Sequence, residues 1–469
     1  MSDFLRRAAD LDAADPLAGF AAEFHVPEGV IYLDGNSLGL MPRRVPARIA
    51  EVATGEWAEG LIRSWTSAGW FTLPMQVGER IAPLIGAAPG DVAVGDSTSV
   101  NLFKGLAAAL HLRPGRRVIL ADAANFPTDS YIAQGLAALV PGVTVRYVES
   151  GQTVRDALAA DVAVLLLSHV DYRTALVQDM AAVTAAAHAH GALVLWDLSH
   201  TTGAVACDLT AADADMAVGC TYKYLNGGPG APAFMWVHPR FSHDLQQPLS
   251  GWMGHAAPFQ FTRDYAPAPG ARRLVCGTPQ VLSLSALDSA LEIWAGVDRA
   301  ALFAKSRAMT SFFIEAVETS CARHGLALVG PRDVTRRGSH VSFDYAHGYE
   351  VVQALIARQP PCASVSRRCT SASRRWRRPS STCATCSTRA PGTTIVSARG
   401  PRSPSPMLFH APLKLDDCRR HGPGSGAELF LVEGDSAAGS VRLVRDPETQ
   451  AVLPMQGKPL NAAKASPDR

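Results

Sequence analysis

The sequence lacks any apolar run of the about 18 residues that a membrane-spanning helix requires. It also lacks a leader-peptide pattern, since Met1–Arg7 is polar and acidic residues soon follow. Its nine cysteines are scattered and odd in number, which favours free thiols over a disulfide framework. We therefore expect neither a membrane protein nor a disulfide-stabilised secreted domain, and the expected location is the cytoplasm.

Acidic residues are missing from residues 351–415, which contain ten Arg and one Lys. Residues 1–350 contain 26 basic and 34 acidic residues, and residues 416–469 contain seven and eight. The formal net charge of +2 is therefore the sum of regions with different charges, and it does not indicate any class of binding partner. A hydrophobic content of 47% and a length of 469 residues indicate a globular protein of two or more domains.

Apolar runs alternate with Ala-rich helical segments over residues 80–350. This order predicts an α/β fold, with a mostly parallel sheet flanked by helices on both faces. A helix is expected over Asp179–His190, ended by Gly191. The predicted strands of the sheet are Arg117–Ala121, Val143–Val148, Val162–Ser168, Leu193–Asp197, Met216–Cys220 and Ala233–Val237.

The flanking regions carry weaker patterns. Ile31–Pro42 indicates a short strand that runs into a Gly/Asn loop, and Arg44–Glu59 is helix-like. Residues 284–325 predict long helices. Ser339–Tyr345 indicates a strand of a second, smaller domain.

Periodicity stops at about residue 358, and residues 358–406 follow neither a helical nor a strand period. One interpretation is a disordered basic linker. The other, favoured by the abruptness of the break, is a segment read in the wrong frame of a GC-rich gene. A zinc site is disfavoured because the cysteine spacing is irregular. The cysteines concerned are Cys362, Cys369, Cys383 and Cys386.

Lys223 follows an apolar strand, stands between two tyrosines and precedes a Gly-Gly-Pro-Gly turn. This setting desolvates the amine and is typical of a lysine that forms a Schiff base. Asp197 ends another strand, at the edge where open α/β sheets bind ligands. Its carboxylate could face a pyridinium nitrogen, or could cap the helical turn that follows. Together the lysine and the acid predict pyridoxal 5'-phosphate as the cofactor.

Two further motifs suit the same cofactor. Gly95–Leu102 is a hydroxyl-rich turn before a helix, where Thr98 and Ser99 could bind a phosphate or serve only as caps. Phe126 could stack on the pyridine ring and Asp129 could bond its hydroxyl, although a capped loop is the alternative.

Single residues in other loops are weaker candidates. Ser168 ends a strand at the same predicted edge of the sheet. His200 could border the cofactor ring or be an ordinary loop histidine. Trp252 and His255 lie in an aromatic loop that could contact an aromatic substrate or merely pack.

These motifs resemble, in order over residues 30 to about 355, those of the kynureninase family. The resemblance implies pyridoxal-phosphate fold type I, the aspartate-aminotransferase fold. It also implies a homodimer that hydrolyses L-kynurenine, and its 3-hydroxy form, to anthranilate and L-alanine in tryptophan breakdown. The matching segments are Leu33–Leu40, Phe126–Asp129, Leu167–Thr174, Asp197–His200, Tyr222–Gly230, Gly251–His255 and Cys276–Pro279.

The resemblance also implies roles for single residues. Lys223 is the implied Schiff-base residue and remover of the α-proton, and Asp197 is the implied pyridine partner. Tyr222 is the implied phosphate-binding tyrosine that also serves in acid–base steps. Ser37 and His255 fall where the family meets its substrate, and no metal is implied. The other implied cofactor contacts are Thr98, Ser99, Phe126, Asp129, Ser168, His200, Trp252 and Thr278.

The chain departs from the family after residue 357. The family continues there with the rest of its small domain, including an arginine that clamps the substrate carboxylate, and no matching stretch is found here. Losing a bidentate clamp would remove several kcal/mol of binding and orientation. Whether the C-terminal region impairs activity is left open.

The tail carries a second resemblance. Glu428–Gly439, expected to be a strand ending in an acidic loop, and Leu453–Asn461 resemble the start of the metal-binding Toprim domain of DNA gyrase. Glu433 matches its first metal carboxylate, but the later paired aspartates are absent, so DNA cleavage is not expected. The expected division is 1–30 (N-terminal segment), 31–285 (large domain), 286–357 (start of a small domain), 358–410 (basic segment) and 411–469 (Toprim-like fragment).

Two alternatives remain. Another fold type I enzyme, such as a cysteine desulfurase, would need a nucleophilic cysteine on a mobile loop, which neither Cys276 nor Cys321 evidently has. A chimeric or nucleic-acid-binding fragment would bind DNA in a salt-sensitive way.

Overall fold

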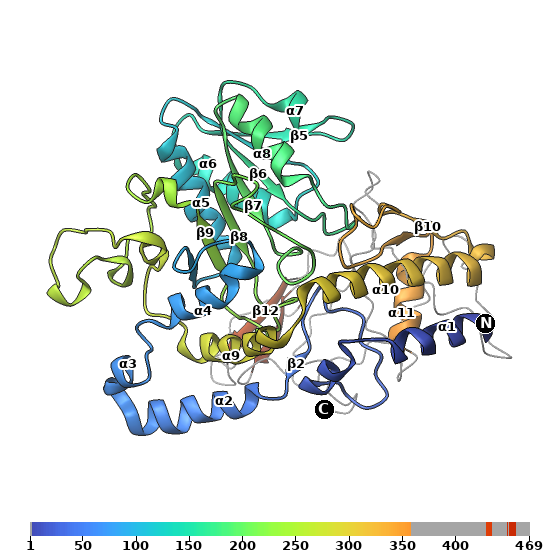
Figure 1. Ribbon diagram of the computed structural model, residues 1–469. Coiled ribbons are helices and arrows are strands. Elements are labelled where there is room, and N and C mark those ends of the chain that lie inside the picture. Colours follow the sequence, from blue (N-terminus) through green and yellow to red (C-terminus); the bar gives the residue numbers. More distant parts are fainter. Residues whose placement is uncertain (1, 358–427, 434–447, 449, 456–469) are drawn as a thin grey trace. The chain divides into compact units, whose positions relative to one another are not determined.

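Seven strands pair into one sheet in the order β3-β9-β8-β7-β6-β4-β5 (Figure 1). Strands β4 to β8 pair in parallel, whereas β9 is antiparallel to both β8 and β3. The predicted mostly parallel sheet is thus confirmed, and each of the six predicted strands is present with ends within about a residue of the prediction. The strands are β3 (Val92–Val94), β4 (Val118–Asp122), β5 (Thr144–Val148), β6 (Val162–Ser168), β7 (Leu193–Asp197), β8 (Met216–Gly219) and β9 (Phe234–Val237).

The computed structural model describes residues 2–357, 428–433, 448 and 450–455. The chain divides into two compact units, residues 1–389 and 390–469. In the second unit, β12 (Glu428–Glu433) and β13 (Gln450–Met455) pair in parallel. The predicted strand at Glu428 is therefore present. The expected basic segment of residues 358–410, the four-cysteine alternative and most of the Toprim-like tail lie outside the described residues.

Helices cover both faces of the large sheet. Along the strands, side chains alternate between two hydrophobic cores, because successive residues of a strand point to opposite faces. Trp196 and Leu165 enter one core with α4, α8 and α9, and Leu195 and Leu166 enter the other with α5 and α6. These helices are α4 (Leu73–Ile81), α5 (Thr98–Leu112), α6 (Pro127–Leu139), α8 (Met180–Ala189) and α9 (Val281–Leu291). The predicted helix of α8 is confirmed, with Asp179 as its N-cap and Gly191 at φ 72° after it.

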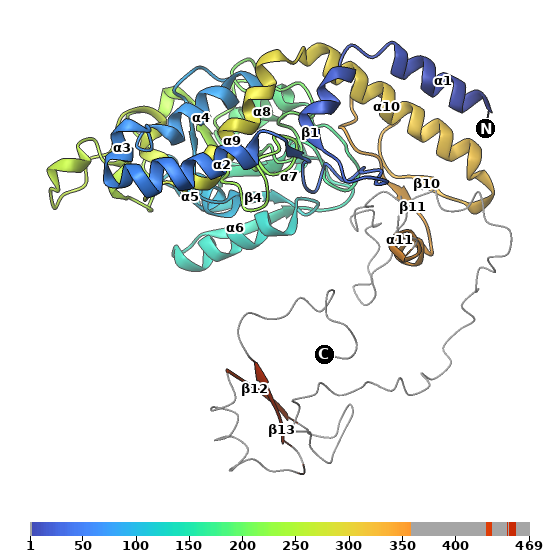
Figure 2. The ribbon, with the colours of Figure 1, turned by 90° about the horizontal axis from the view of Figure 1, so that it is seen from below.

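The elements after α9 have a hydrophobic cluster of their own, in the part of the chain predicted to begin a smaller domain. Helix α10 (Arg299–Ser320) packs with β11 (Phe343–Asp344) in this cluster, around Ile314 and Phe343. β11 pairs antiparallel with β10 (Ala327–Leu328), and α11 (Gly348–Ala357) closes the described part. The N-terminal helix α1 (Ser2–Ala13) lies along α10 (Figure 2), where Arg7 pairs with Glu315 at 2.7 Å. This ion pair joins α1 to α10.

The weaker sequence patterns were only partly right. Ile31 is not in a strand: only β2 (Met41–Pro42) forms there, pairing with β1 (Phe24–His25). The helix expected over Arg44–Glu59 begins as α2 (Val45–Glu51) and continues as a π-helix, η2 (Val52–Gly60). The strand expected over Ser339–Tyr345 is limited to the two residues of β11, which pair with the two residues of β10. The remaining short helices are α3 (Ser64–Ser67) and α7 (Val154–Ala157).

Two other expectations can be compared with the fold. In the described part of the chain, Cys207, Cys220 and Cys276 are free thiols, as predicted. None of the helices in that part combines the length and apolar character that crossing a lipid bilayer requires.

Candidate active site

The carboxyl ends of β6, β7 and β8 bring three predicted residues to one edge of the sheet. Ser168 ends β6 and lies opposite Asp197, the last residue of β7. Asp197 in turn lies opposite Val218 of β8, and Lys223 follows β8 after a short turn. Parallel strands open a crevice beyond their carboxyl ends, so residues from three separate motifs meet at a single ligand-binding edge.

The amine of Lys223 is enclosed by two aromatic side chains. Lys223 is 4% exposed, and its Nζ lies 2.8 Å from Nε2 of His200 and 5.8 Å from the centroid of the Tyr222 ring. His200 is buried as well. Burying a charged ammonium is costly, whereas a neutral amine can share a hydrogen bond with an imidazole. Once it is neutral, an amine buried at this edge can act as nucleophile or base.

Two buried carboxyl groups lie close enough to Lys223 to interact with it. Burial raises the pKa of Asp129 well above its ordinary range, the Asp197 carboxylate raises it further, and Lys223 opposes both. Burial likewise raises the pKa of Asp197, against a 2.8 Å hydrogen bond donated by the Ser199 N–H to Oδ1. Oδ2 of Asp129 is buried and has no hydrogen-bond partner among the described residues. An acidic site of this kind calls for a donor from a ligand.

A recess of about 650 Å³ lies beside Tyr222, and Ser37, Thr98 and Gln280 also line it. Helix α5 begins at Thr98, followed by Ser99, and its N-cap Ser97 accepts a hydrogen bond from the Val100 N–H. The first N–H groups of a helix have no partner within it, and with neighbouring hydroxyls they bind phosphate well. The recess is therefore suited to an anion.

Asn125 fixes the entrance of α6 to the end of β6. Its Nδ2 donates to the Leu166 carbonyl at 3.0 Å, and its Oδ1 accepts from the Ser168 N–H at 3.0 Å. Phe126, the next residue, packs edge-to-face on Tyr172 with ring centroids 5.3 Å apart. Asn125 thereby holds the residue pair Phe126 and Asp129 near Ser168.

Three predicted residues do not join this group within one chain. Trp252 packs on Trp65 and Phe259, and the hydrogen bonds of the His255 side chain stay within residues 255–264. Thr278 is exposed on the segment before α9. Across the described residues, no hydrogen bond, ion pair or ring contact joins Trp252, His255 or Thr278 to Lys223.

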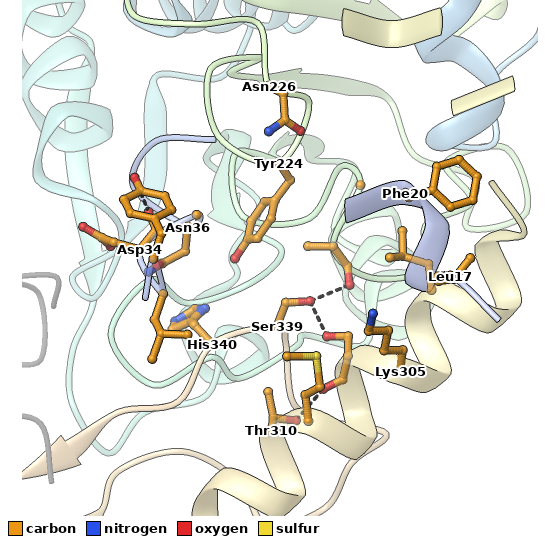
Figure 3. A pocket seen from close by; sticks show the side chains of 18 of the residues that line it. Leu17, Phe20, Asp34, Asn36, Tyr224, Asn226, Lys305, Thr310, Ser339 and His340 are labelled. Carbon is orange, nitrogen blue, oxygen red and sulfur yellow. Dashed lines mark hydrogen bonds between the residues drawn. The ribbon is translucent and has the colours of Figure 1, made fainter. Parts of the chain in front are cut away.

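The structure adds two residues that the sequence patterns did not select. A cavity of about 890 Å³, lined by the N-terminal segment, the large domain and α10, has Tyr224 and His340 in its wall (Figure 3). Burial raises the pKa of Tyr224, and its Oη has no hydrogen-bond partner in the described structure. Adjacency to Lys223 was a usable signal for Tyr224.

His340 connects this cavity to the lysine. Its ring centroid lies 5.4 Å from that of His200. Burial lowers the pKa of His340 to about 4, although the Asp171 carboxylate and the Tyr172 carbonyl oppose this. Neither ring nitrogen makes a well-formed hydrogen bond within the described residues. His340 comes from the smaller domain, and no motif spacing links it to Lys223.

The chemistry of the site fits pyridoxal phosphate. The buried amine suits the aldehyde of that molecule, and the buried carboxyl group, which has no donor among the described residues, suits its ring. The hydroxyl-lined recess suits its phosphate. Within residues 2–357 and the two described tail strands, no cluster of three or more His, Cys, Asp or Glu side chains could hold a metal.

Comparisons with known proteins agree with this chemistry. The kynureninase C-terminal domain family matches residues 302–359. A kynureninase of Deinococcus radiodurans is 56% identical over 351 residues, which cover 74% of this chain and 85% of the relative.

Solved structures share the fold. A cysteine desulfurase of Thermococcus onnurineus has a TM-score of 0.59 at 18% identity, covering 75% of this chain and 86% of that one. A variant of the protein C-DES, with glycine covalently linked to its pyridoxal-phosphate cofactor, has a TM-score of 0.60 at 17% identity, covering 73% and 89%. At such identities the likeness shows the fold alone, which is pyridoxal-phosphate fold type I, so it does not favour the desulfurase alternative.

Proposed function

The chain belongs to the kynureninase family, and we propose that it hydrolyses L-kynurenine to anthranilate and L-alanine. The observation that carries the proposal is the buried Lys223 amine, which lies 2.8 Å from His200 and interacts with two buried carboxyl groups. The enzyme is a pyridoxal-phosphate hydrolase that acts on a carbon–carbon bond, and the 3-hydroxy form of kynurenine is included in the proposal.

Different residues would bind different parts of the cofactor. Bound pyridoxal phosphate supplies an electron sink for the charge that develops at the substrate's α-carbon. Lys223 would hold its aldehyde carbon, Asp197 would face its ring nitrogen and Asp129 its hydroxyl. The N-terminus of α5 would hold the phosphate. The other proposed contacts are Thr98, Ser99, Phe126, Ser168, His200, Tyr222, Trp252 and Thr278.

Lys223 and Tyr222 are the proposed proton carriers. The buried Nζ of Lys223 would take the proton from the substrate's α-carbon. The reaction consumes one water and breaks the bond between the β-carbon and the γ-carbonyl carbon. The Tyr222 hydroxyl would donate the proton that the β-carbon gains, since its ring lies beside Lys223.

The substrate would lie between the recess and the cavity. Ser37 lines the recess together with Tyr222, which supports its proposed contact with substrate. The neighbouring cavity offers aromatic walls and the polar atoms of Tyr224 and His340, which suit an aromatic ring that carries an amino group.

A homodimer would complete the site. Trp252, His255 and Thr278 lie away from Lys223 in one chain, and the loop that carries the first two exposes large apolar side chains. Phe259 is 63% exposed and Phe261 81% exposed. Such a surface favours association with a second copy, whose Lys223 these residues would reach. We place the dimer in the cytoplasm, with no membrane or nucleic-acid partner.

Anthranilate release from L-kynurenine tests the proposal. Purified full-length protein with added pyridoxal phosphate should release anthranilate, and Lys223→Ala should lower the rate by about 10³-fold or more. Borohydride reduction should trap the cofactor on Lys223 in the unsubstituted protein. Sulfide release from L-cysteine, without anthranilate release from kynurenine, would overturn the proposal in favour of a desulfurase.

A further inference from the structure

A lysine that takes no part in the proposed chemistry is buried beneath the anion recess. Lys104, in the second turn of α5, is 1% exposed. Its Nζ bonds Oδ2 of Asp96 at 2.6 Å, Oδ1 of Asn101 at 3.1 Å and the Leu274 carbonyl at 2.7 Å. An ammonium has three protons to donate, so these partners account for all of them.

Its acidic partner faces the recess. Asp96 is the one charged residue among the described residues that line the recess, beside Thr98 and Tyr222. Asp96 also has a left-handed backbone, with φ 56°, which an L-residue adopts only when its surroundings hold it there. The Ala233 N–H donates to its carbonyl at 2.9 Å.

The same lysine braces the loop that contains Asp96. Asn101, which accepts from Lys104, donates to the Gly95 carbonyl at 3.0 Å. The Leu274 carbonyl ties the loop to the segment before α9, where Thr278 and Gln280 lie. The Lys104 side chain therefore links the loop of Asp96 to the chain segment that leads to Gln280, and both Asp96 and Gln280 line the recess.

We propose that Lys104 is a positioning residue for the cofactor phosphate: it holds the Asp96 carboxylate and cancels its charge, so that the recess accepts a dianion. The inference rests on the proposed function, because the phosphate of pyridoxal phosphate is the anion concerned. A carboxylate at the rim of a phosphate site repels the ligand unless a cation neutralises it. Thr98, Ser99 and Tyr222 bring no positive charge of their own.

A purely structural role for the ion pair makes a different prediction. Breaking a buried ion pair destabilises a protein whatever ligand it binds, so binding of the cofactor with and without its phosphate would weaken alike. The neutralising role predicts that only the phosphate-bearing form suffers. Pyridoxal, which lacks the phosphate but keeps the aldehyde and the ring, is the matched probe.

The test compares the affinities of full-length protein for pyridoxal phosphate and for pyridoxal, from absorbance titrations of cofactor-free protein. Lys104→Met should weaken pyridoxal phosphate binding by about tenfold or more and pyridoxal binding little. Asp96→Asn, which leaves the lysine, should keep or increase the preference for the phosphate form. The double variant, with neither charge, should recover most of that preference.

Equal weakening of both probes in Lys104→Met would overturn the inference, as would a loss of phosphate preference in Asp96→Asn. The second variant and the double variant keep the test decisive if Lys104→Met fails to fold. Anthranilate release by the unsubstituted protein reports separately on the proposed function. Protein that prefers pyridoxal phosphate but releases no anthranilate would contradict the function and leave the inference standing.

Discussion

Asp129 is a buried carboxyl group whose Oδ2 makes no hydrogen bond within the described residues. Its pKa is raised by burial, so between the ordinary carboxyl range and the raised value the folded state binds more protons than the unfolded state. The unfolding free energy therefore falls as pH rises through that window. Asp129→Asn should raise the unfolding free energy of cofactor-free protein near pH 8 by about 1–3 kcal/mol, and should weaken cofactor binding.

Urea unfolding of the two proteins at several pH values measures this effect. Asp156→Asn is the matched control, because a hydrogen bond from Thr153 lowers the pKa of Asp156 and the residue is exposed. That variant should gain no stability. An Asp129→Asn protein less stable than the unsubstituted one near pH 8 would show that the carboxylate has a partner in the folded chain.

His169 gives the opposite dependence on pH. Burial lowers its pKa to about 4, and Nδ1 lies 3.0 Å from Oγ1 of Thr201. The pKa of a histidine in the unfolded chain is about 6.5. The unfolding free energy therefore falls by up to about 3 kcal/mol as pH falls from above this pKa toward 4. His169→Gln should lose less stability than the unsubstituted protein between about pH 7 and pH 5. The exposed His243→Gln should keep the original dependence, and equal dependences in all three proteins would refute the prediction.

Residues at the ends of strands were predictable, and those brought in from other domains were not. Lys223, Asp197 and Ser168 could be placed together because parallel strands share one carboxyl edge. Tyr222 and His200 followed from their places in the same motifs. His340 reaches His200 from the smaller domain, and that approach depends on how α10 and β11 pack, which no local spacing encodes. The roles of all these residues stay predictions.

At the scale of elements, the loop of residues 33–40 depends on one glycine. Gly39 donates its N–H to the Tyr222 carbonyl at 2.9 Å, and a Cβ there would lie 2.2 Å from the Lys223 carbonyl oxygen. Gly39→Ala should therefore push the loop off the lysine turn and cost about 1–3 kcal/mol of stability. Cofactor affinity should fall with it, because Ser37 and Tyr222 line the same recess.

Gly35 supplies the control within the same loop, since a Cβ added there meets nothing within 4 Å. Thermal unfolding and cofactor titration of Gly39→Ala and Gly35→Ala would separate a specific clash from a general stiffening of the loop. Similar losses in both variants would contradict the close approach of the loop to the lysine turn.

Element prediction succeeded where apolar runs were long and failed where pairing was short. The strands from β6 to β9 are buried on both faces and appear as continuous apolar runs, so their positions could be read directly, whereas β5 at the edge of the sheet is only partly buried. β10 and β11 span two residues each, which leaves no period to detect. The change from α2 to the π-helix η2 keeps a helical pattern, so the sequence could not separate them.

For the whole molecule, the alternation of strands and helices was sufficient to predict the fold class, because few architectures bury such a pattern. Domain boundaries within residues 1–357 stay predictions. The departure from the family after residue 357 lies beyond the described part of the large unit. The proposed dimer would complete the site, since the proposed cofactor contacts Trp252 and Thr278 lie apart from Lys223 in one chain.

Complementation between inactive variants tests this assembly. In a symmetric dimer each protomer contributes the same residue to the site of the other protomer. Lys223→Ala and Trp252→Ala should each be poorly active alone. After mixing, unfolding and refolding together, about half of the dimers would be mixed, and each would contain one site with both native residues. Activity should then recover to about a quarter of the native value.

Separate refolding of each variant, followed by mixing without further unfolding, controls for activation by refolding itself. A second pair of variants, Asp197→Ala with Lys223→Ala, should not complement, because both residues belong to the same edge of one sheet. Recovery in the control pair would mean that Asp197 and Lys223 do not serve the same site of one chain. Absence of recovery with Trp252→Ala, although the mixed dimer forms, would mean that Trp252 acts in its own protomer. The loop around η6 (Trp252–Gly254) would then have to reorganise within a single chain to reach Lys223.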